Sequence, residues 1–410
     1  MTHPVVDYLP APARAAVNGA WQRLNADQRR DLEQWLPNAG NISGVRDIVE
    51  YITQNYRTAL DHTAATIAIV GPANVGKSTL YNQLVMPDQA KAAVGPVPGT
   101  TRVNQEGSAG LFGLVDTPGA DAVGPVGERE RDIAFAAARD ADFLVVMFDA
   151  GSGVRKAERE LFDALMALNK PHLVVLNKMD LVKKGERDKV IDSAAENLSI
   201  DRSKIIDVSA ARGDHVGSIV LAIAQAEPRL LLSLADALPA YRSKLAWQRI
   251  IQAATASASV ALIPLPVADM IPLLGVQTGR ILTIARIYGF DITPARAKEL
   301  LAAFGLGFLA RSVYRELAKF LGAPGWVLSA AVAASATVAM GYAAMVWFER
   351  GEKPAPEALR KMMTDVGAYL RDALTQGGKD TGGSAPGDKK GLVKRIQAAL
   401  EGLPERFRPS

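Results

Sequence analysis

A glycine-rich segment near residue 75 combines the residue types that bind phosphate groups. Residues 71–78 read GPANVGKS and fit the spacing G-x-x-x-x-G-K-[ST]. Glycines let the backbone curl so that its N–H groups point at phosphate oxygens. Lys77 would reach the terminal phosphates, and the Ser78 hydroxyl would ligate Mg²⁺. The segment therefore predicts a nucleotide-phosphate cradle, the plainer alternative being a glycine-rich turn with an exposed lysine.

A second motif, LVDTPG, supplies a carboxylate and a backbone donor after an apolar run. Asp116 would hold Mg²⁺ through water, and the Gly119 N–H would meet the γ-phosphate. In isolation, DTPG would be read as an ordinary turn. Beside the phosphate cradle, it predicts the magnesium side of the same site.

Two further motifs indicate which base the nucleotide carries. In NKMD (177–180), the Asp180 carboxylate can accept hydrogen bonds from guanine N1–H and N2–H₂, which adenine lacks. Asn177 would brace the loop, and the stem of Lys178 would lie over the base. The backbone N–H groups of VSA (208–210) would meet guanine O6. Together these motifs predict a site for GTP and GDP.

The elements that must position these motifs are short apolar strands separated by helical patterns. The expected strands are 66–71, 110–116, 142–149, 171–178 and 204–209. Near-continuous apolar strands between helices predict an α/β fold, with a mostly parallel sheet covered by helices on both faces. The motifs fall at the carboxyl ends of these strands, where open α/β sheets bind ligands.

Residues 64–232 resemble a translation-factor-type GTPase of the Era, tRNA-modification (TrmE) and septin-like group, in the motifs GPANVGKS, PGTTR, DTPG, NKMD and VSA. The resemblance implies slow GTP hydrolysis, with Thr101 closing over Mg²⁺ as the switch threonine and Thr100 as the weaker choice. Motifs and resemblance together give the nucleotide-binding set Gly71, Asn74, Val75, Gly76, Lys77, Ser78, Thr79, Asp116, Gly119, Asn177, Lys178, Asp180, Ser209 and Ala210. The implied magnesium ligands are Ser78, Thr101 and Asp116, and the implied catalytic residues are Lys77, Thr101 and Asn74.

Two departures from Ras-like GTPases concern catalysis. Ala120 follows DTPG, where Ras-type enzymes carry the glutamine that orients water, and Asp121 is the alternative residue for positioning the water. Asn74 matches the P-loop asparagine that helps hold a potassium ion in related GTPases. Such an ion would supply the charge of an arginine finger. The simpler role for Asn74, bracing the loop, stays open.

The C-terminal half is rich in apolar helical patterns. Residues 326–348 carry no charge and would extend about 30 Å as a helix, enough to cross a bilayer core. Eight of these 23 residues are alanine, which also suits the centre of a helical bundle. The segment 254–276 contains three prolines and Asp269, and is either a hairpin that enters the membrane or a buried helix–turn–helix.

Residues 240–350 resemble the uncharacterised YcjF-like domain found C-terminal to Era-like GTPases and associated with membranes. The resemblance implies peripheral or integral membrane contact through 250–350, at the inner face of the bacterial inner membrane. The N-terminus lacks the features of a signal peptide, which favours a cytoplasmic location. After a Gly/Ser-rich linker (375–388), a basic amphipathic helix (389–403) would rest on anionic lipid or contact a partner.

These patterns divide the chain into four parts. We expect an N-terminal helical segment (1–62), a GTPase domain (63–232), an all-α domain (233–350), and a helix with a linker and a basic tail (351–410). The absence of cysteine excludes disulfides, and the four histidines lack metal-ligand spacing. A net charge of +4 gives no direct sign of nucleic acid.

The predicted function is a GTP-hydrolysing molecular switch at the cytoplasmic face of a membrane, with pairing of two GTPase domains as a further implication of the resemblance. The alternatives are a cytosolic Era-like GTPase of ribosome or RNA biogenesis, and a GTP-regulated scaffold with a partner-binding helical domain. An RNA module of the KH type needs a basic G-x-x-G loop, and the nearest match, GAPG (322–325), has no flanking charge.

Overall fold

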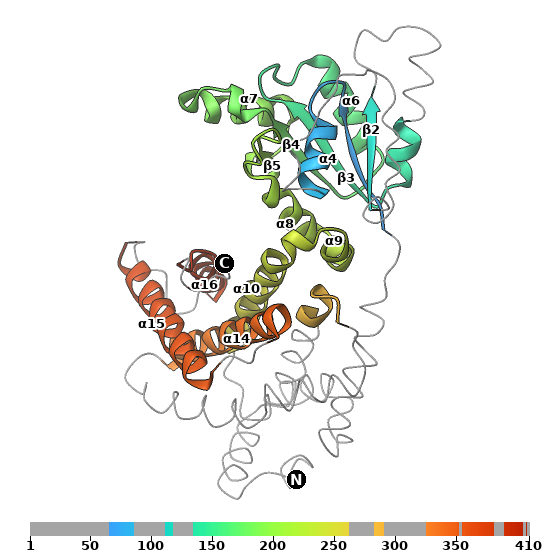
Figure 1. Ribbon diagram of the computed structural model, residues 1–410. Coiled ribbons are helices and arrows are strands. Elements are labelled where there is room, and N and C mark those ends of the chain that lie inside the picture. Colours follow the sequence, from blue (N-terminus) through green and yellow to red (C-terminus); the bar gives the residue numbers. More distant parts are fainter. Residues whose placement is uncertain are drawn as a thin grey trace, which may run out of the picture. The chain divides into compact units, whose positions relative to one another are not determined.

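The computed structural model of the chain describes residues 65–85, 111–117, 134–261, 283–290, 325–351, 355–380, 389–404 and 407 (Figure 1). The chain divides into two compact units, with a boundary between Leu245 and Ala246. Several predictions lie outside the described residues. They are the N-terminal helices of 1–62, Thr101, Gly119, Ala120, Asp121, and the part of the proline-containing segment from 262 to 276.

The first unit is built on a parallel sheet. Its strands are β1 (Ile67–Pro72), β2 (Phe112–Thr117), β3 (Phe143–Asp149), β4 (His172–Asn177) and β5 (Ile205–Asp207). Within the described residues, these five strands run in the order β2-β1-β3-β4-β5, and every neighbouring pair is parallel. The predicted sheet is confirmed, and β5 is shorter than the sequence pattern indicated.

Helices cover both faces of this sheet because its strands are apolar on both sides. The main helices of the unit are α4 (Lys77–Val85), α6 (Lys156–Met166), α7 (Arg187–Leu198), α8 (Val216–Ala226) and α9 (Leu231–Ala237), and residues 134–140 are also helical. Alternate strand side chains form one core with α6 and α7, in which Val146, Phe162 and Leu198 are buried. The other face packs against α4 and α8. The predicted two-sided fold is confirmed.

Strand register brings the motif-bearing strand ends together. Gly71 of β1 pairs with Asp116 of β2, and Asp149 of β3 pairs with Asn177 of β4. A Cβ atom at Gly71 would lie 2.3 Å from the Met147 carbonyl oxygen, so only glycine allows β1 to approach β3 this closely. The phosphate motif after β1 and the base motif after β4 therefore both start at the carboxyl end of the sheet, with β3 between them.

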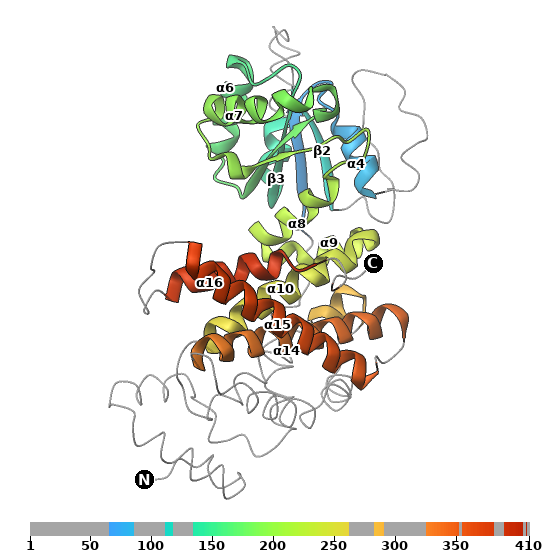
Figure 2. The same cartoon turned by 90° about the vertical axis from the view of Figure 1, so that its left-hand side faces the viewer.

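The second unit is helical in the part that the structure describes. Its main helices are α10 (Arg242–Ala261, entering from the first unit), α14 (Gly325–Arg350), α15 (Pro356–Asp380) and α16 (Lys389–Glu401). The alanine-rich α14 packs along α15 (Figure 2). Residues 334–341 are buried on all sides of α14. Because these positions are mostly small, neighbouring helices can approach α14 closely, as in the centre of a bundle.

Among the residues described above, no single helix is long and apolar enough to cross a membrane. The joined pair Val216–Ala226 and Pro228–Ala237 meets the length and composition criteria only with a bend of 117° between its halves.

The C-terminal helix packs part of its apolar stripe against protein. Ile396, Leu400 and Leu403, three residues of that stripe, are at most 1% exposed. The Tyr369 hydroxyl of α15 donates to the Gly402 carbonyl over 3.1 Å, next to this stripe. Helix α15 also extends to Asp380, so the linker predicted from residue 375 begins later.

Close packing of α14 on α10 generates a stability prediction. A Cβ atom at Gly341 would lie 2.5 Å from Ile250 Cγ1, so we expect Gly341→Ala to lower the free energy of unfolding by about 1–3 kcal/mol through overpacking. Urea denaturation of the full chain measures this. Gly367→Ala is the matched control, because its Cβ would meet Ser335 only at 3.4 Å. Equal unfolding midpoints for the two variants would contradict the packing described.

Candidate functional site

The loop between β1 and α4 curls through two residues in the left-handed region. Asn74 has φ 63° and Gly76 has φ 97°. Asparagine adopts this conformation more readily than most residues, which accounts for its place in the loop on conformational grounds alone. The Asn74 side chain is exposed. Gly76 admits no side chain, because a Cβ atom there would lie 2.4 Å from Asn177 Nδ2.

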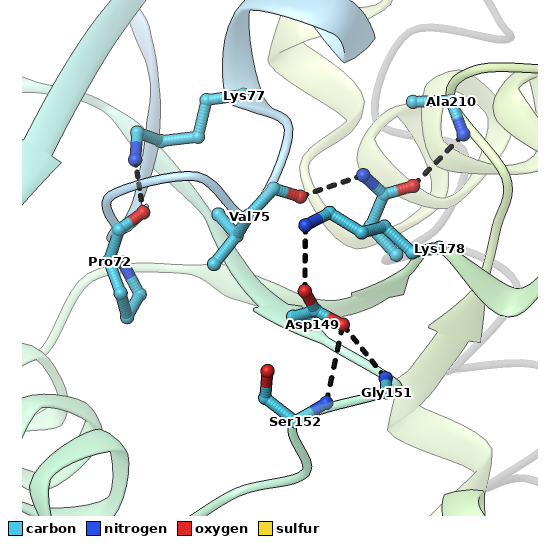
Figure 3. Close-up of polar contacts among 9 residues, drawn as sticks. Pro72, Val75, Lys77, Asp149, Gly151, Ser152, Lys178 and Ala210 are labelled. Carbon is cyan, nitrogen blue, oxygen red and sulfur yellow. Dashed lines mark hydrogen bonds and ion pairs between the residues drawn. The ribbon is translucent and has the colours of Figure 1, made fainter. Parts of the chain in front are cut away.

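Lys77 lies at the start of α4 with its ammonium group inside the curl. The residue is 4% exposed, and Nζ donates to the carbonyl oxygen of Gly71 at 2.7 Å. It also donates to the Pro72 carbonyl oxygen at 2.6 Å (Figure 3). A buried ammonium needs acceptors, and phosphate oxygens are stronger acceptors than carbonyls. Ser78 and Thr79 follow, partly buried, in the first turn of α4, where the helix dipole favours an anion.

Asn177, at the end of β4, joins two loops of the site. Its Nδ2 donates to the Val75 carbonyl over 2.8 Å, and its Oδ1 accepts from the Ala210 N–H over 2.9 Å (Figure 3). The side chain is 3% exposed, so both partners are shielded from water. The structure gives the bracing contacts that the sequence predicted for Asn177. It also directs the Ala210 N–H to Asn177, where the sequence predicted guanine O6 as its partner.

Asp180 lies in the short 3₁₀ helix η3 (Met179–Leu181) with its carboxylate mostly buried. The side chain is 12% exposed, and Arg212 Nε lies 3.8 Å from its Oδ2. Ser209 is buried and closes a small turn by exchanging two 3.1 Å backbone bonds with Asp214. Sequence reasoning missed Arg212, whose nearness to Asp180 depends on this turn.

Asp149 is the second residue near the site that sequence reasoning missed. Its Oδ2 accepts from Lys178 Nζ over 2.7 Å, and its Oδ1 accepts from the Gly151 N–H over 2.8 Å (Figure 3). Lys178 itself is left-handed, with φ 66°. The available signal was an aspartate that ends an apolar strand, as Asp116 does.

The residues present fit magnesium bound to a nucleotide. The Ser78 hydroxyl group belongs to the first turn of α4, and the strand register sets Asp116 beside Gly71 at the start of the same loop. Hydroxyl and carboxylate oxygens are the ligands that Mg²⁺ takes beside phosphates. The third predicted ligand, Thr101, lies outside the described residues.

The sheet, the phosphate loop and the base-side carboxylate define a P-loop GTPase domain, and the comparison with known families agrees. Residues 66–178 match the family described as 50S ribosome-binding GTPase. Residues 229–372 match a domain of unknown function, DUF697. The chain thus joins a GTPase-like region to a C-terminal region that is similar to a domain of unknown function.

Curated relatives match over the GTPase region. GTPase Der of Rhodopseudomonas palustris (strain TIE-1) is 35% identical over 186 residues, which cover 44% of this chain and 39% of that protein. GTPase Der of Clostridium botulinum (strain Hall) is 30% identical over 186 residues, 42% of each. The chain spans about two-fifths of the length of these relatives.

Two solved structures illustrate the range of likeness. Aquifex aeolicus Era bound to GDP and AlF₄⁻ is 24% identical, covering 46% of this chain and 67% of that chain, with a TM-score of 0.32. A member of an oligomerised bacterial dynamin pair is 12% identical, covering 97% of this chain and 76% of that chain, with a TM-score of 0.33. Because both TM-scores are low, the fold is inferred from the strand order of the sheet and from the family match, and not from these two structures.

The double role of Asn177 generates a prediction for this site. Asn177→Ala leaves the buried Val75 carbonyl and Ala210 N–H without their partner, so we expect GDP affinity to fall about 10- to 100-fold. Isothermal titration of the full chain with GDP measures this. Asn197→Ala is the matched control, because its amide, in α7, donates to the Val154 carbonyl just before α6. Wild-type affinity in Asn177→Ala would contradict the bracing role.

Proposed function

We propose that this protein binds and hydrolyses GTP and works as a molecular switch. The observation that carries the proposal is the pair of hydrogen bonds made by the Asn177 amide. One goes to Val75 in the phosphate loop and the other to Ala210 in the base-side loop. Asn177 itself lies three residues before Asp180, whose carboxylate is proposed to bind the base. One buried side chain thus holds the two halves of a guanine-nucleotide site in a fixed relation. The curated relatives named above are GTPases, which supports the same activity here.

Each residue has a chemical task in this proposal. The Lys77 ammonium exchanges its carbonyl acceptors for β- and γ-phosphate oxygens, and the N–H groups at the start of α4 receive the phosphates. Ser78 and Asp116, with Thr101 from the switch loop, hold Mg²⁺. When bound, this ion neutralises charge that develops on the transferred phosphate. Asp180 reads the guanine edge.

The base preference is tested by changing one atom of the carboxylate. Asp180→Asn replaces an acceptor of guanine N1–H and N2–H₂ with a donor suited to the xanthine C2 carbonyl. We therefore expect GTP affinity to fall at least about 10-fold, and XTP affinity to rise. Competition binding with GTP and XTP measures both. Asp163→Asn, in the exposed Arg159 pair of α6, is the matched control. Unchanged GTP affinity in Asp180→Asn would refute the guanine assignment.

We further propose that a potassium ion near Asn74 supplies positive charge during hydrolysis. The support is the asparagine in the phosphate loop and its exposed side chain. Hydrolysis should then be faster in KCl than in NaCl at equal ionic strength. Asn74→Gly keeps the left-handed conformation and removes the amide, so it should abolish the difference between the salts. Equal wild-type rates in both salts would exclude potassium.

The GTPase domain is proposed to belong to the Era- and TrmE-like class and to act at the inner face of a membrane through a YcjF-like helical unit. Support comes from the charge-free sequence between Phe320 and Phe348 and from the low charge of 251–279. Because 334–341 are enclosed by protein, α14 would have to part from its neighbours before it could enter lipid. The support for the ribosome-directed alternative is the match of residues 66–178 to the family described as 50S ribosome-binding GTPase.

Fractionation tests the membrane proposal. The full chain, expressed in bacteria, should stay in the membrane pellet after washes with high salt and with carbonate, because apolar contact resists both. A truncated chain ending at Leu245, the boundary between the two units, is the comparison and should be released. Recovery of the full chain in the wash supernatants would overturn membrane action and leave a GTPase with a partner-binding helical unit.

A further inference from the structure

We infer that Asp149 is a positioning residue for the nucleotide base: by holding the Lys178 ammonium, it fixes the Lys178 stem as one wall of the base site beside Asp180. The inference deepens the proposed function and rests on it. Asp149 itself need not touch the nucleotide, since its effect passes through Lys178.

The strand ends bring the two residues together. Asp149 ends β3 and pairs in register with Asn177, the residue before Lys178. The Ala150 N–H donates to the Asn177 carbonyl over 2.8 Å, so the parallel ladder continues one residue past β3. The base motif and the loop after β3 therefore form one hydrogen-bonded edge.

The backbone of Lys178 is held in an unusual conformation. Its φ of 66° lies in the left-handed region, which lysine seldom adopts. Fixed bonds flank it on both sides, the Asn177 carbonyl accepting from Ala150 and the Met179 N–H donating to the Val208 carbonyl over 3.1 Å. Because these hydrogen bonds fix the backbone, they also fix the direction in which the Lys178 side chain leaves its Cα atom.

The far end of Lys178 is held by a carboxylate that is itself fixed. Asp149 Oδ1 accepts from the N–H groups of Gly151 at 2.8 Å and Ser152 at 3.4 Å, and Oδ2 accepts from Lys178 Nζ at 2.7 Å (Figure 3). The two oxygens thus divide the tasks of closing the turn and anchoring the lysine. The pair is partly buried, with side chains 31% exposed for Lys178 and 19% for Asp149, so solvent screens it only in part.

A stem fixed at both ends suits a planar base. Four methylene groups between Lys178 Cα and Nζ offer an apolar surface two residues before the guanine-reading Asp180. A free lysine would lose rotamer freedom when a base packed on it, whereas a stem already ordered loses little. Loss of the Asp149 charge should therefore weaken nucleotide binding by freeing the lysine, even though the base contacts themselves are unchanged.

The competing explanation is that Asp149 only closes the turn through Gly151 and Ser152. A double-mutant cycle separates the two roles. Asp149→Asn keeps an oxygen for the turn and removes the charge that holds the lysine. Lys178→Met keeps an unbranched apolar stem without the ammonium and leaves the turn intact.

The experiment measures GDP dissociation constants by titration calorimetry of the full chain in wild type, both single variants and the double variant. We expect Asp149→Asn to weaken GDP binding about 5- to 10-fold at low salt, less at 0.5 M NaCl, and less than about 2-fold further in the Lys178→Met background. Wild-type affinity in Asp149→Asn, or the same loss in both backgrounds, would overturn the inference.

Two controls make each result decisive. Asp163→Asn, which alters an exposed ion pair on α6, should bind GDP like wild type. Asp180→Asn is titrated in parallel: loss of affinity there with none in Asp149→Asn overturns only the positioning role. No loss in Asp180→Asn overturns the base site and the inference together. If Asp149→Asn unfolds below the assay temperature, the Lys178→Met variant alone tests the inference. Wild-type GDP affinity in Lys178→Met would show that the anchored lysine does not contribute to binding, and would overturn the positioning role of Asp149.

Discussion

The nucleotide site depends on one buried amide. Asn177 joins the phosphate loop to the loop after β5 through two hydrogen bonds, and both partners are backbone groups that water cannot reach. Gly76 must lack a side chain for this amide to approach. The order of the strands agrees with this contact, since β1 and β4 lie on either side of β3 and their carboxyl ends are only one strand apart.

Two lysine ammonium groups lie near the loops that Asn177 joins. Lys77 and Lys178 are both held by oxygen acceptors of the protein, the first by carbonyls and the second by Asp149. Carbonyl oxygens are easily exchanged for phosphate oxygens, whereas a carboxylate keeps its ammonium. The two lysines therefore differ in their acceptors: Lys77 is held by backbone carbonyls, and Lys178 by a carboxylate.

Much of the first unit could be predicted from the sequence because its signals are local. Apolar strand runs, the phosphate motif and NKMD each lie within a few residues, and the sheet has the expected strands and direction. Asp149 and Arg212 could not be found in this way, since their contacts with Lys178 and Asp180 arise from strand register and a distant turn. The bond of the Ala210 N–H to Asn177 could not be found for the same reason, because it spans 33 residues.

In the helical unit, composition alone does not determine whether an apolar helix lies in lipid or in a protein core. An uncharged alanine-rich helix suits lipid or a protein core, and only its neighbours distinguish them. Ile250 fills the space above Gly341, and α15 runs along α14, so the described part of the unit has protein around this helix. The apolar stripe of α16 was open to the same two interpretations, and it too is covered by protein.

We propose that the carboxyl end of the sheet, with Asp180, binds guanine in preference to adenine. The most direct test compares GDP and ADP by titration calorimetry of the full chain in the presence of magnesium. Because adenine offers Asp180 neither donor, the account predicts GDP binding at least about 1,000-fold tighter than ADP binding. Equal affinities for the two nucleotides would contradict it.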